Sequence, residues 1–214
     1  FQDIYDQSIR NPEKFWQEAS EDIFWFKKPT KILNKSNPPF YKWFEDGITN
    51  TCYNALDIHI DQGRGDKTAL IYDSPITKNK KRFTYKELKT KVSKFSGALK
   101  NQGVKKGDRV IIYMPMIPEA VIAMLACVRI GAIHSVVFGG FASNELASRI
   151  DDSKAKILVT SSCGFEPGKT VEYKPLVDAA IKMASHKIDK MILFQRTGHE
   201  VKLNAPNEIS WEEA

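Results

Sequence analysis

Short apolar runs and longer segments with helical periodicity alternate along residues 67–194. The short runs predict strands, because each has about the length of a strand and is bounded by turn residues. They lie at 68–72, 109–113, 133–138, 156–160 and 190–194. The longer segments predict helices near 84–102, 117–130, 143–152 and 175–185. This alternation predicts an α/β fold, a parallel sheet flanked by helices and joined by right-handed crossovers.

Among these helices, the one at 84–102 has the clearest sequence signals for its start and its end. Thr84 and Glu87 have the spacing of a capping box, in which each side chain accepts from the other residue's backbone amide. Leu88, Val92, Phe95 and Leu99 then form one apolar stripe, and Gly103 predicts the helix end. Ser143 is the predicted cap of the 143–152 helix.

Residues 1–65 differ from the rest of the chain in composition and pattern, because they contain many aromatic residues and show little helical or strand periodicity. Asn11-Pro12 predicts one helix start, and Asn34–Pro39 has the composition of a loop. We interpret 1–65 as an irregular extension whose aromatic side chains pack against the main domain, residues 66–214. At the other end, 209–214 is predicted to be helical and to leave the sheet edge uncovered, as in a piece of a longer protein.

Composition narrows the class of protein. The 214 residues are 42% hydrophobic and 27% charged, as in a globular protein, and no apolar run is long enough to span a membrane. Three widely spaced cysteines predict neither a disulfide framework nor a zinc site, and favour a reducing compartment rather than secretion. Residue 1 is Phe rather than Met, so the lack of a targeting peptide carries no weight.

The net charge of +6 raises the question of nucleic acid binding. The densest basic cluster, residues 78–82, lies between two predicted strands, 68–72 and 82–84. We interpret it as a solvated hairpin loop and predict no nucleic acid partner.

The glycine pair in Phe138-Gly139-Gly140-Phe141 is the first candidate site. It follows an apolar strand directly, and ligands of open α/β sheets bind at the carboxyl ends of the strands. Glycine there permits a positive φ and a close approach of ligand to backbone. A tight turn without a ligand is the alternative.

A second candidate site, residues 164–170, imitates a phosphate-binding P-loop. Only three residues separate Gly164 from Gly168, one fewer than a P-loop requires. Pro167 lacks an amide donor and Glu166 would face the phosphates. We therefore predict a polar loop at the sheet edge, with Lys169 available to a phosphate. The rigid turn at 113–119 shows no catalytic pattern, and neither does the rest of the chain.

The chain resembles the acetyl- and propionyl-CoA synthetases, AMP-forming ligases of the acyl-adenylate-forming superfamily. The resemblance is densest in the run YMPMIPEAVIAMLACVRIGAIHSVVFGGF at 113–141 and continues at 147–152. The motifs at 24–27, 42–47 and 54–57 resemble that family's N-terminal extension. The resemblance thus implies the extension at 1–65 and an incomplete first part of the AMP-binding domain at 66–214.

The family adenylates a carboxylate with ATP, releases pyrophosphate, and transfers the acyl group to CoA with release of AMP. The resemblance implies acetate or propionate, ATP and CoA as substrates, Mg²⁺ in the complete enzyme and a role in lipid metabolism. It also implies a CoA nucleotide site formed by Phe138, Gly139, Gly140, Glu166, Pro167, Gly168, Lys169 and Val171, with Val171 at the adenine. It identifies no catalytic residue and no metal ligand here.

One departure from the family pattern affects this site. Acetyl-CoA synthetases carry Arg-Gly-Gly-Arg-like residues where this chain has Glu-Pro-Gly-Lys at 166–169, and this variant is more similar to the propionate-preferring branch. The resemblance places the protein in the mitochondrial matrix or the cytoplasm, and no oligomeric state follows from it. A catalytically empty binding module is the alternative function. A P-loop nucleotide switch ranks below it.

The family's ATP-phosphate loop, acyl pocket and catalytic lysine domain have no match in residues 1–214. We therefore expect this chain alone neither to adenylate acetate nor to form acyl-CoA. A pyrophosphate-release assay on the purified chain tests this, and measurable turnover would contradict it.

Overall fold

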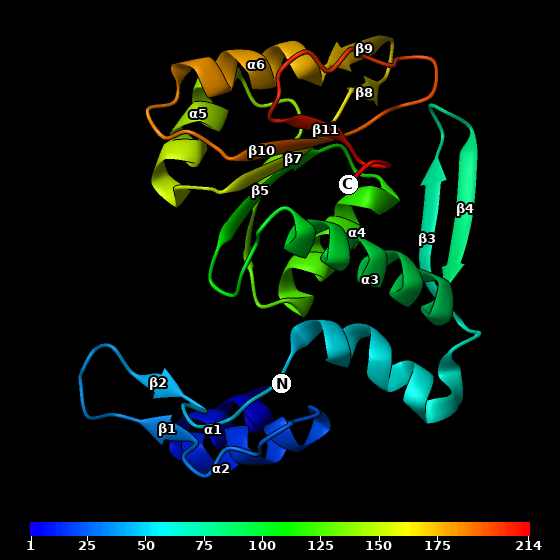
Figure 1. Cartoon of the computed structure of the whole chain (residues 1–214). Coiled ribbons are helices and arrows are strands. Elements are labelled where there is room, and N and C mark those ends of the chain that lie inside the picture. The colour runs from blue at the N-terminus through cyan, green and yellow to red at the C-terminus, as the bar shows by residue number, and fades with distance from the viewer. The chain divides into compact units, whose positions relative to one another are not determined.

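The computed structural model describes residues 1–214, and five parallel strands form its main sheet (Figure 1). Their order across the sheet is β11-β10-β7-β5-β6, and every neighbouring pair is parallel. The strands are β5 (Arg109–Met114), β6 (Ile133–Phe138), β7 (Ile157–Ser161), β10 (Lys190–Phe194) and β11 (Glu208–Ser210). The predicted parallel α/β sheet is therefore confirmed.

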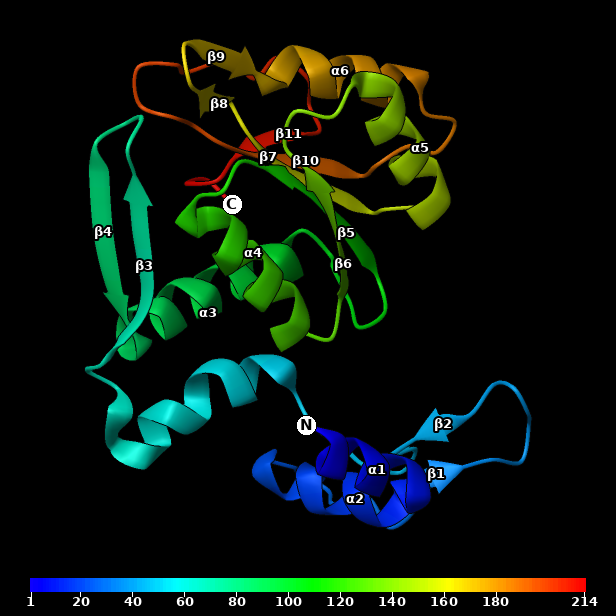
Figure 2. The same cartoon turned by 180° about the vertical axis from the view of Figure 1, so that it is seen from behind.

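Four helices cover the two faces of this sheet (Figures 1 and 2). One face carries α3 (Tyr85–Asn101) and α4 (Pro118–Arg129), and the other carries α5 (Ser143–Ser153) and α6 (Tyr173–Met183). Successive side chains of β5 point to opposite faces, so Ile111 and Tyr113 enter the core beneath α5 and α6. The central strands β5 and β7 are thus almost entirely buried, as expected for a parallel sheet, whereas the edge strand β6 keeps several exposed side chains.

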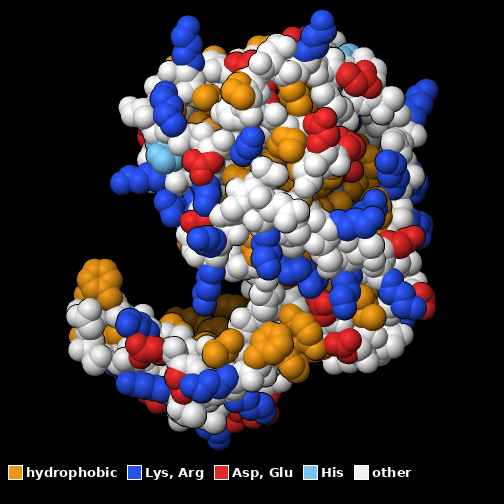
Figure 3. Space-filling view, viewed as in Figure 1, with side chains coloured by type: hydrophobic (Ala, Val, Ile, Leu, Met, Phe, Trp, Pro, Cys, Tyr) orange, Lys and Arg blue, Asp and Glu red, His pale blue; other side chains and the backbone are white.

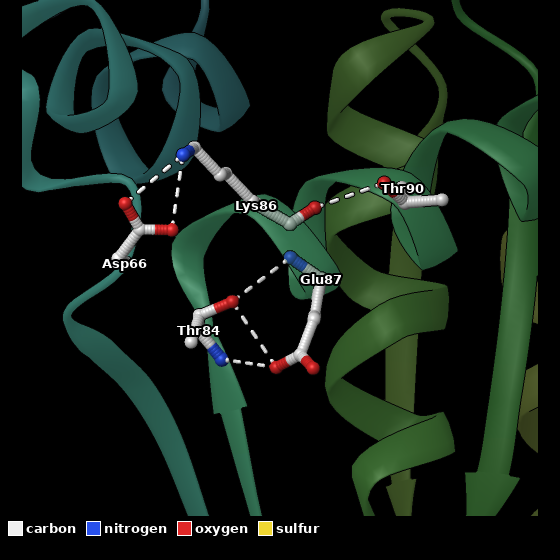
Figure 4. Close-up of polar contacts among 5 residues, drawn as sticks. All are labelled: Asp66, Thr84, Lys86, Glu87 and Thr90. Atoms are coloured by element: carbon white, nitrogen blue, oxygen red, sulfur yellow. Dashed lines mark hydrogen bonds and ion pairs between the residues drawn. The ribbon is translucent and has the colours of Figure 1, made fainter.

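The capping box at the start of α3 is confirmed (Figure 4). The Glu87 amide donates to Thr84 Oγ1 at 3.2 Å, and the Thr84 amide donates to Glu87 Oε2 at 2.8 Å. Lys86 in the same turn pairs with Asp66 at 2.9 Å. Gly103, with φ +82°, follows the helix end as predicted.

Two local predictions are wrong. Ser143 is the first helical residue of α5 rather than its cap. The cap is Ala142, whose backbone is extended and which has no side chain to accept a hydrogen bond. The basic cluster is mostly strand rather than loop, because β4 (Asn79–Thr84) pairs antiparallel with β3 (Thr68–Ser74) along its whole length. Only Lys78 lies in the turn.

Within the hairpin, Lys80 also pairs across the strands with Asp73 at 2.6 Å, and both side chains are exposed. The residues of the cluster are exposed, as predicted. Figure 3 shows Lys and Arg side chains spread over the visible face among acidic and uncharged ones.

The end of the chain also differs from the prediction. Residues 208–210 form β11, which pairs with β10 and covers that edge of the sheet. The Trp211 amide donates to Leu193 O at 2.9 Å, and the Trp211 ring stacks on Phe95 with 3.7 Å between centroids. Backbone pairing and ring stacking therefore outweigh the weak helical pattern of 209–214.

The chain divides into two compact units, Phe1–Ile58 and His59–Ala214, and the sheet belongs to the second. The first contains α1 (Gln2–Arg10), α2 (Pro12–Ala19), a 3₁₀ turn (Ser20–Asp22), the strand pair β1 (Leu33–Asn34) and β2 (Lys42–Trp43), and a π-helical turn (Tyr53–Asp57). A second π-helical turn, Ile60–Arg64, belongs to the second unit.

Asn11 caps α2, as predicted, and accepts from the Lys14 amide at 3.2 Å. Aromatic rings pack together inside the first unit, for example Phe24 with Tyr53 at 4.6 Å. Their packing against the main domain stays a prediction, as does the domain boundary near residue 65. No disulfide joins the three cysteines, all of which are buried, and none of the helices is long and apolar enough to cross a membrane.

A buried ion pair joins α6 to β11. Lys174 lies 2.9 Å from Glu208 and 2.6 Å from Asp178, and the Lys174 and Glu208 side chains are 11% and 8% exposed. Burial alone lowers the pKa of Lys174, but the hydrogen bonds to Asp178 and Glu208 outweigh it and raise that pKa overall. Burial raises the pKa of Glu208, but the hydrogen bond from Lys174 and two backbone amides lower it overall.

We predict that Lys174→Met lowers the free energy of unfolding by about 3 kcal/mol, because it leaves the Glu208 carboxylate buried without its cation. Glu208→Gln should cost less, since Lys174 keeps Asp178 as its partner.

The same ion pair predicts a pH dependence. Because the pKa of Glu208 is lowered on folding, its contribution to stability is present above the unfolded pKa of about 4.3 and is lost as the pH falls through the folded value. Urea denaturation at pH 7 and in steps below pH 4 measures both effects. Equal costs for the two variants at pH 7 would contradict the asymmetry.

Candidate functional site

The carboxyl ends of β5 and β6, strand β8, the residue Arg196 just after β10, and the tip of the β3–β4 hairpin border one groove of about 350 Å³. Its walls are Tyr72–Pro75, Met114–Ile117, Val136–Gly139, Gly164–Glu166, Tyr173 and Arg196. Figure 2 shows the hairpin standing beside this edge of the sheet. The carboxyl edge of the sheet, where a ligand site was predicted, therefore contains a groove whose walls are partly apolar and partly polar.

Tyr113 fixes the glycine loop after β6. Its hydroxyl donates to Phe141 O at 2.8 Å and accepts from the Gly140 amide at 3.3 Å. Burial raises the pKa of this phenol, so it stays protonated and able to donate near neutral pH. Gly140 has φ +106°, a conformation that favours glycine. The predicted positive φ is thus found at Gly140.

Gly139 is required for a different reason, because no side chain fits there. A Cβ at Gly139 would collide with the Tyr173 hydroxyl and lie 3.0 Å from Met114 O. A Cβ at Gly164 would lie 2.7 Å from the same hydroxyl. The Tyr173 ring packs 4.8 Å from that of Tyr113, and its hydroxyl lies between the two glycines. The close approach at Gly139 is therefore made by the chain's own tyrosine.

The segment predicted as a polar loop is a β-hairpin. Strand β8 (Cys163–Glu166) pairs with β9 (Lys169–Glu172), and Pro167 and Gly168 make the turn, with φ +75° at Gly168. The strands pair their backbone groups with each other, so these amides cannot curl around a phosphate as those of a P-loop do. Val171, on β9, packs against the core cluster beneath α5 and α6.

The two predicted loops meet at the rim of the groove. A Cβ on Gly140 would lie 3.7 Å from Glu166 Oε1. Phe138, Gly139 and Glu166 line the groove, whereas Pro167, Gly168, Lys169 and Val171 lie outside its walls. Lys169 Nζ pairs with Glu166 Oε2 at 3.0 Å, and both side chains are largely exposed.

Arg196 lines the groove and was not among the predicted site residues. It comes two residues after β10, and its guanidinium lies 4.7 Å from the centre of the Phe165 ring. Its amide donates to Ser162 Oγ at 2.8 Å. The rule that ligands bind at the carboxyl ends of parallel strands pointed to it, because β10 is one of those strands.

Comparison with known proteins identifies relatives for both units. A family model described as AMP-binding enzyme matches residues 58–213, and one described as acetyl-coenzyme A synthetase N-terminus matches residues 1–55. The human protein "Acyl-CoA synthetase short-chain family member 3, mitochondrial" is 54% identical over 207 residues, which are 96% of this chain and 30% of the relative. An "Acetyl-coenzyme A synthetase" of Streptomyces avermitilis is 44% identical over 99% of this chain and 32% of its own length.

Among solved structures, "Acetoacetyl-CoA Synthetase from Streptomyces lividans" matches with a TM-score of 0.85 at 24% identity. The match covers 97% of this chain and 31% of that one, and it shows the same fold. The chain spans about 30% of the length of the curated relatives it matches.

We predict that Gly139→Ala lowers the free energy of unfolding by roughly 1–3 kcal/mol, because the added methyl group collides with the Tyr173 hydroxyl. Tyr173→Phe removes that oxygen, so the double variant should lose less than the two single losses added together. Urea denaturation measures all three. Gly97→Ala is the matched control. Gly97 lies inside α3 with nothing within 4 Å of an added Cβ, and this change should stabilise the helix. Strict additivity would disprove the collision.

Proposed function

Because this chain belongs to the AMP-binding enzyme family, we propose that the full-length protein containing it is an AMP-forming short-chain acyl-CoA synthetase. The similarity to short-chain acyl-CoA and acetyl-CoA synthetases over nearly all of the chain supports this proposal. The protein would use ATP to convert acetate or propionate to the acyl-adenylate, and CoA would then displace AMP.

Within this reaction, we assign the rim of the groove to the nucleotide part of CoA. The observation that carries the assignment is the meeting of two separate loops: the backbone of Gly140 lies beside the Glu166 carboxylate. Phe138, Gly139 and Gly140 supply one side of this rim. Glu166, Pro167, Gly168 and Lys169 supply the other, with Val171 at the adenine. The glycine backbone admits a flat ring or a phosphate close to the chain.

The positive charge of Lys169 at this rim is neutralised by Glu166, and this affects how Lys169 could bind a phosphate of CoA. Lys169 can bind a phosphate as a mobile point charge, but its ammonium pairs with Glu166 at 3.0 Å. A phosphate would have to replace that carboxylate. Both groups are exposed, so water screens the pair and the exchange costs little.

Further assignments follow from the same relatives. The Glu-Pro-Gly-Lys turn suggests the propionate-preferring branch, and the mitochondrial relative suggests the mitochondrial matrix, with the cytoplasm as the alternative. Residues 1–65 would be the synthetase N-terminal extension, and 66–214 the first part of the adenylation domain. Mg²⁺ would accompany ATP in the complete enzyme. No group of three or more His, Cys, Asp or Glu side chains is placed to hold a metal, and we assign no residue to it.

In the full-length protein, Lys169→Ala should raise the KM for CoA about ten-fold or more and leave the adenylation half-reaction unchanged, because it removes one charge-assisted contact. Glu166→Gln should lower the KM for CoA, since it frees the Lys169 ammonium. Pyrophosphate exchange measures the first half-reaction, and thioester formation measures the second. Lys202→Ala, at an exposed lysine away from the groove, is the control. Equal losses in both half-reactions would refute the CoA assignment.

A further inference from the structure

A cation, Arg196, and the hydroxyl of a buried tyrosine, Tyr173, lie in the groove without a polar side-chain partner on this chain. The Arg196 guanidinium forms no ion pair and lies over the Phe165 ring. The Tyr173 hydroxyl has no hydrogen-bond partner on the chain, and it keeps access to solvent although only 3% of the surface of the residue is exposed. By contrast, the nearby Lys169 ammonium is already paired with Glu166.

Both groups are held in place by the fold. Arg196 is fixed at its backbone by Ser162 Oγ, which belongs to a residue that is 1% exposed. A guanidinium lying over a ring keeps its N–H donors in its own plane, where they can meet an acceptor. The Tyr173 hydroxyl lies between Gly139 and Gly164, and all three residues line the groove.

Both groups act as donors. An arginine side chain has no acceptor atom. Burial, followed by the neighbouring Tyr113 and Glu166, raises the pKa of Tyr173 to about 12, so this phenol stays protonated. A cationic fork beside a neutral hydroxyl favours an anion with several oxygens, and arginine binds phosphate through two parallel hydrogen bonds. A groove of about 350 Å³ with apolar walls at Met114 and Phe138 holds more than inorganic phosphate.

Building on the proposed CoA site, we propose that Arg196, assisted by the Tyr173 hydroxyl, binds a phosphate group of CoA in this groove. Arg196 would then be the principal phosphate ligand on this part of the protein, because it lines the groove, whereas Lys169 lies outside its walls. The Glu-Pro-Gly-Lys turn would thus shape the rim, while the charge that holds the nucleotide comes from the end of β10.

Titration calorimetry of CoA, dephospho-CoA and ATP into the full-length protein tests this proposal. Arg196→Gln keeps part of the side chain but removes the charge, and it should raise the Kd for CoA about ten-fold or more while leaving ATP unchanged. The Kd of Arg196→Lys for CoA should fall between those of the wild type and Arg196→Gln, because a point charge replaces the planar guanidinium. Tyr173→Phe should weaken CoA roughly three-fold. Arg149→Ala, at an exposed arginine of α5 outside the groove, should bind CoA like the wild type.

Dephospho-CoA identifies the phosphate. If the penalty of Arg196→Gln disappears with this ligand, the contact is to the 3′-phosphate, and if it persists, the contact is to the diphosphate. Either result supports the proposal. A Kd for CoA within two-fold of the wild type in folded Arg196→Gln would overturn it, as would equal losses for CoA and ATP. Thermal unfolding identifies which variants are folded.

The Lys169→Ala variant separates this inference from the proposed function. If Lys169→Ala weakens CoA and Arg196→Gln does not, the CoA site stands and only the role of Arg196 fails. If neither variant affects CoA, the CoA assignment itself fails.

Discussion

The carboxyl edge of the sheet is organised around the contact between Tyr173 and two glycines. The ring of Tyr173 packs on Tyr113, and its hydroxyl occupies the space that side chains at Gly139 and Gly164 would need. Tyr113 in turn holds the backbone at Gly140 and Phe141. One aromatic pair therefore sets the distance between the loop after β6 and the β8–β9 hairpin. The groove exists because these two loops are held at that distance.

Charge at this edge is divided between a flexible pair and a fixed group. Lys169 and Glu166 are exposed and neutralise each other at the tip of a short hairpin. Arg196 lies against Phe165, with its backbone held by Ser162. A long exposed side chain loses rotamer freedom when a ligand orders it, whereas a packed guanidinium has lost much of that freedom on folding. The fixed cation can therefore bind an anion at a lower entropic cost.

The layered fold could be predicted from the sequence because each strand and helix carries its own local signal. The capping box of Thr84 and Glu87 and the stripe of Leu88 to Leu99 needed no tertiary information. Two of the errors fell where pairing between strands decides the structure, whereas the cap of α5, Ala142, differs from the predicted Ser143 by a single residue. Residues 208–210 become a strand only because β10 offers an edge, and the hairpin at 163–172 forms although Pro167 and Gly168 were the only turn signal. For the site, the sequence located both loops but not their contact. Arg196 follows the predicted strand 190–194 by two residues, and only the folded chain shows that it lines the same groove as those loops.

The order of the strands has a consequence for how the chain folds during synthesis. After β5, the next strand pairs on one side of it and the following one on the other, and β10 and β11 then add outward in turn. Each new strand therefore meets an edge that has already been made, and no strand has to insert between two earlier ones. Such a sheet can grow as the chain leaves the ribosome, because after β6 has paired, new strands add only at the edge opposite β6. The ion pair of Lys174 with Glu208 can form only after β11 has been made, and it joins this strand to a helix that precedes it in the chain.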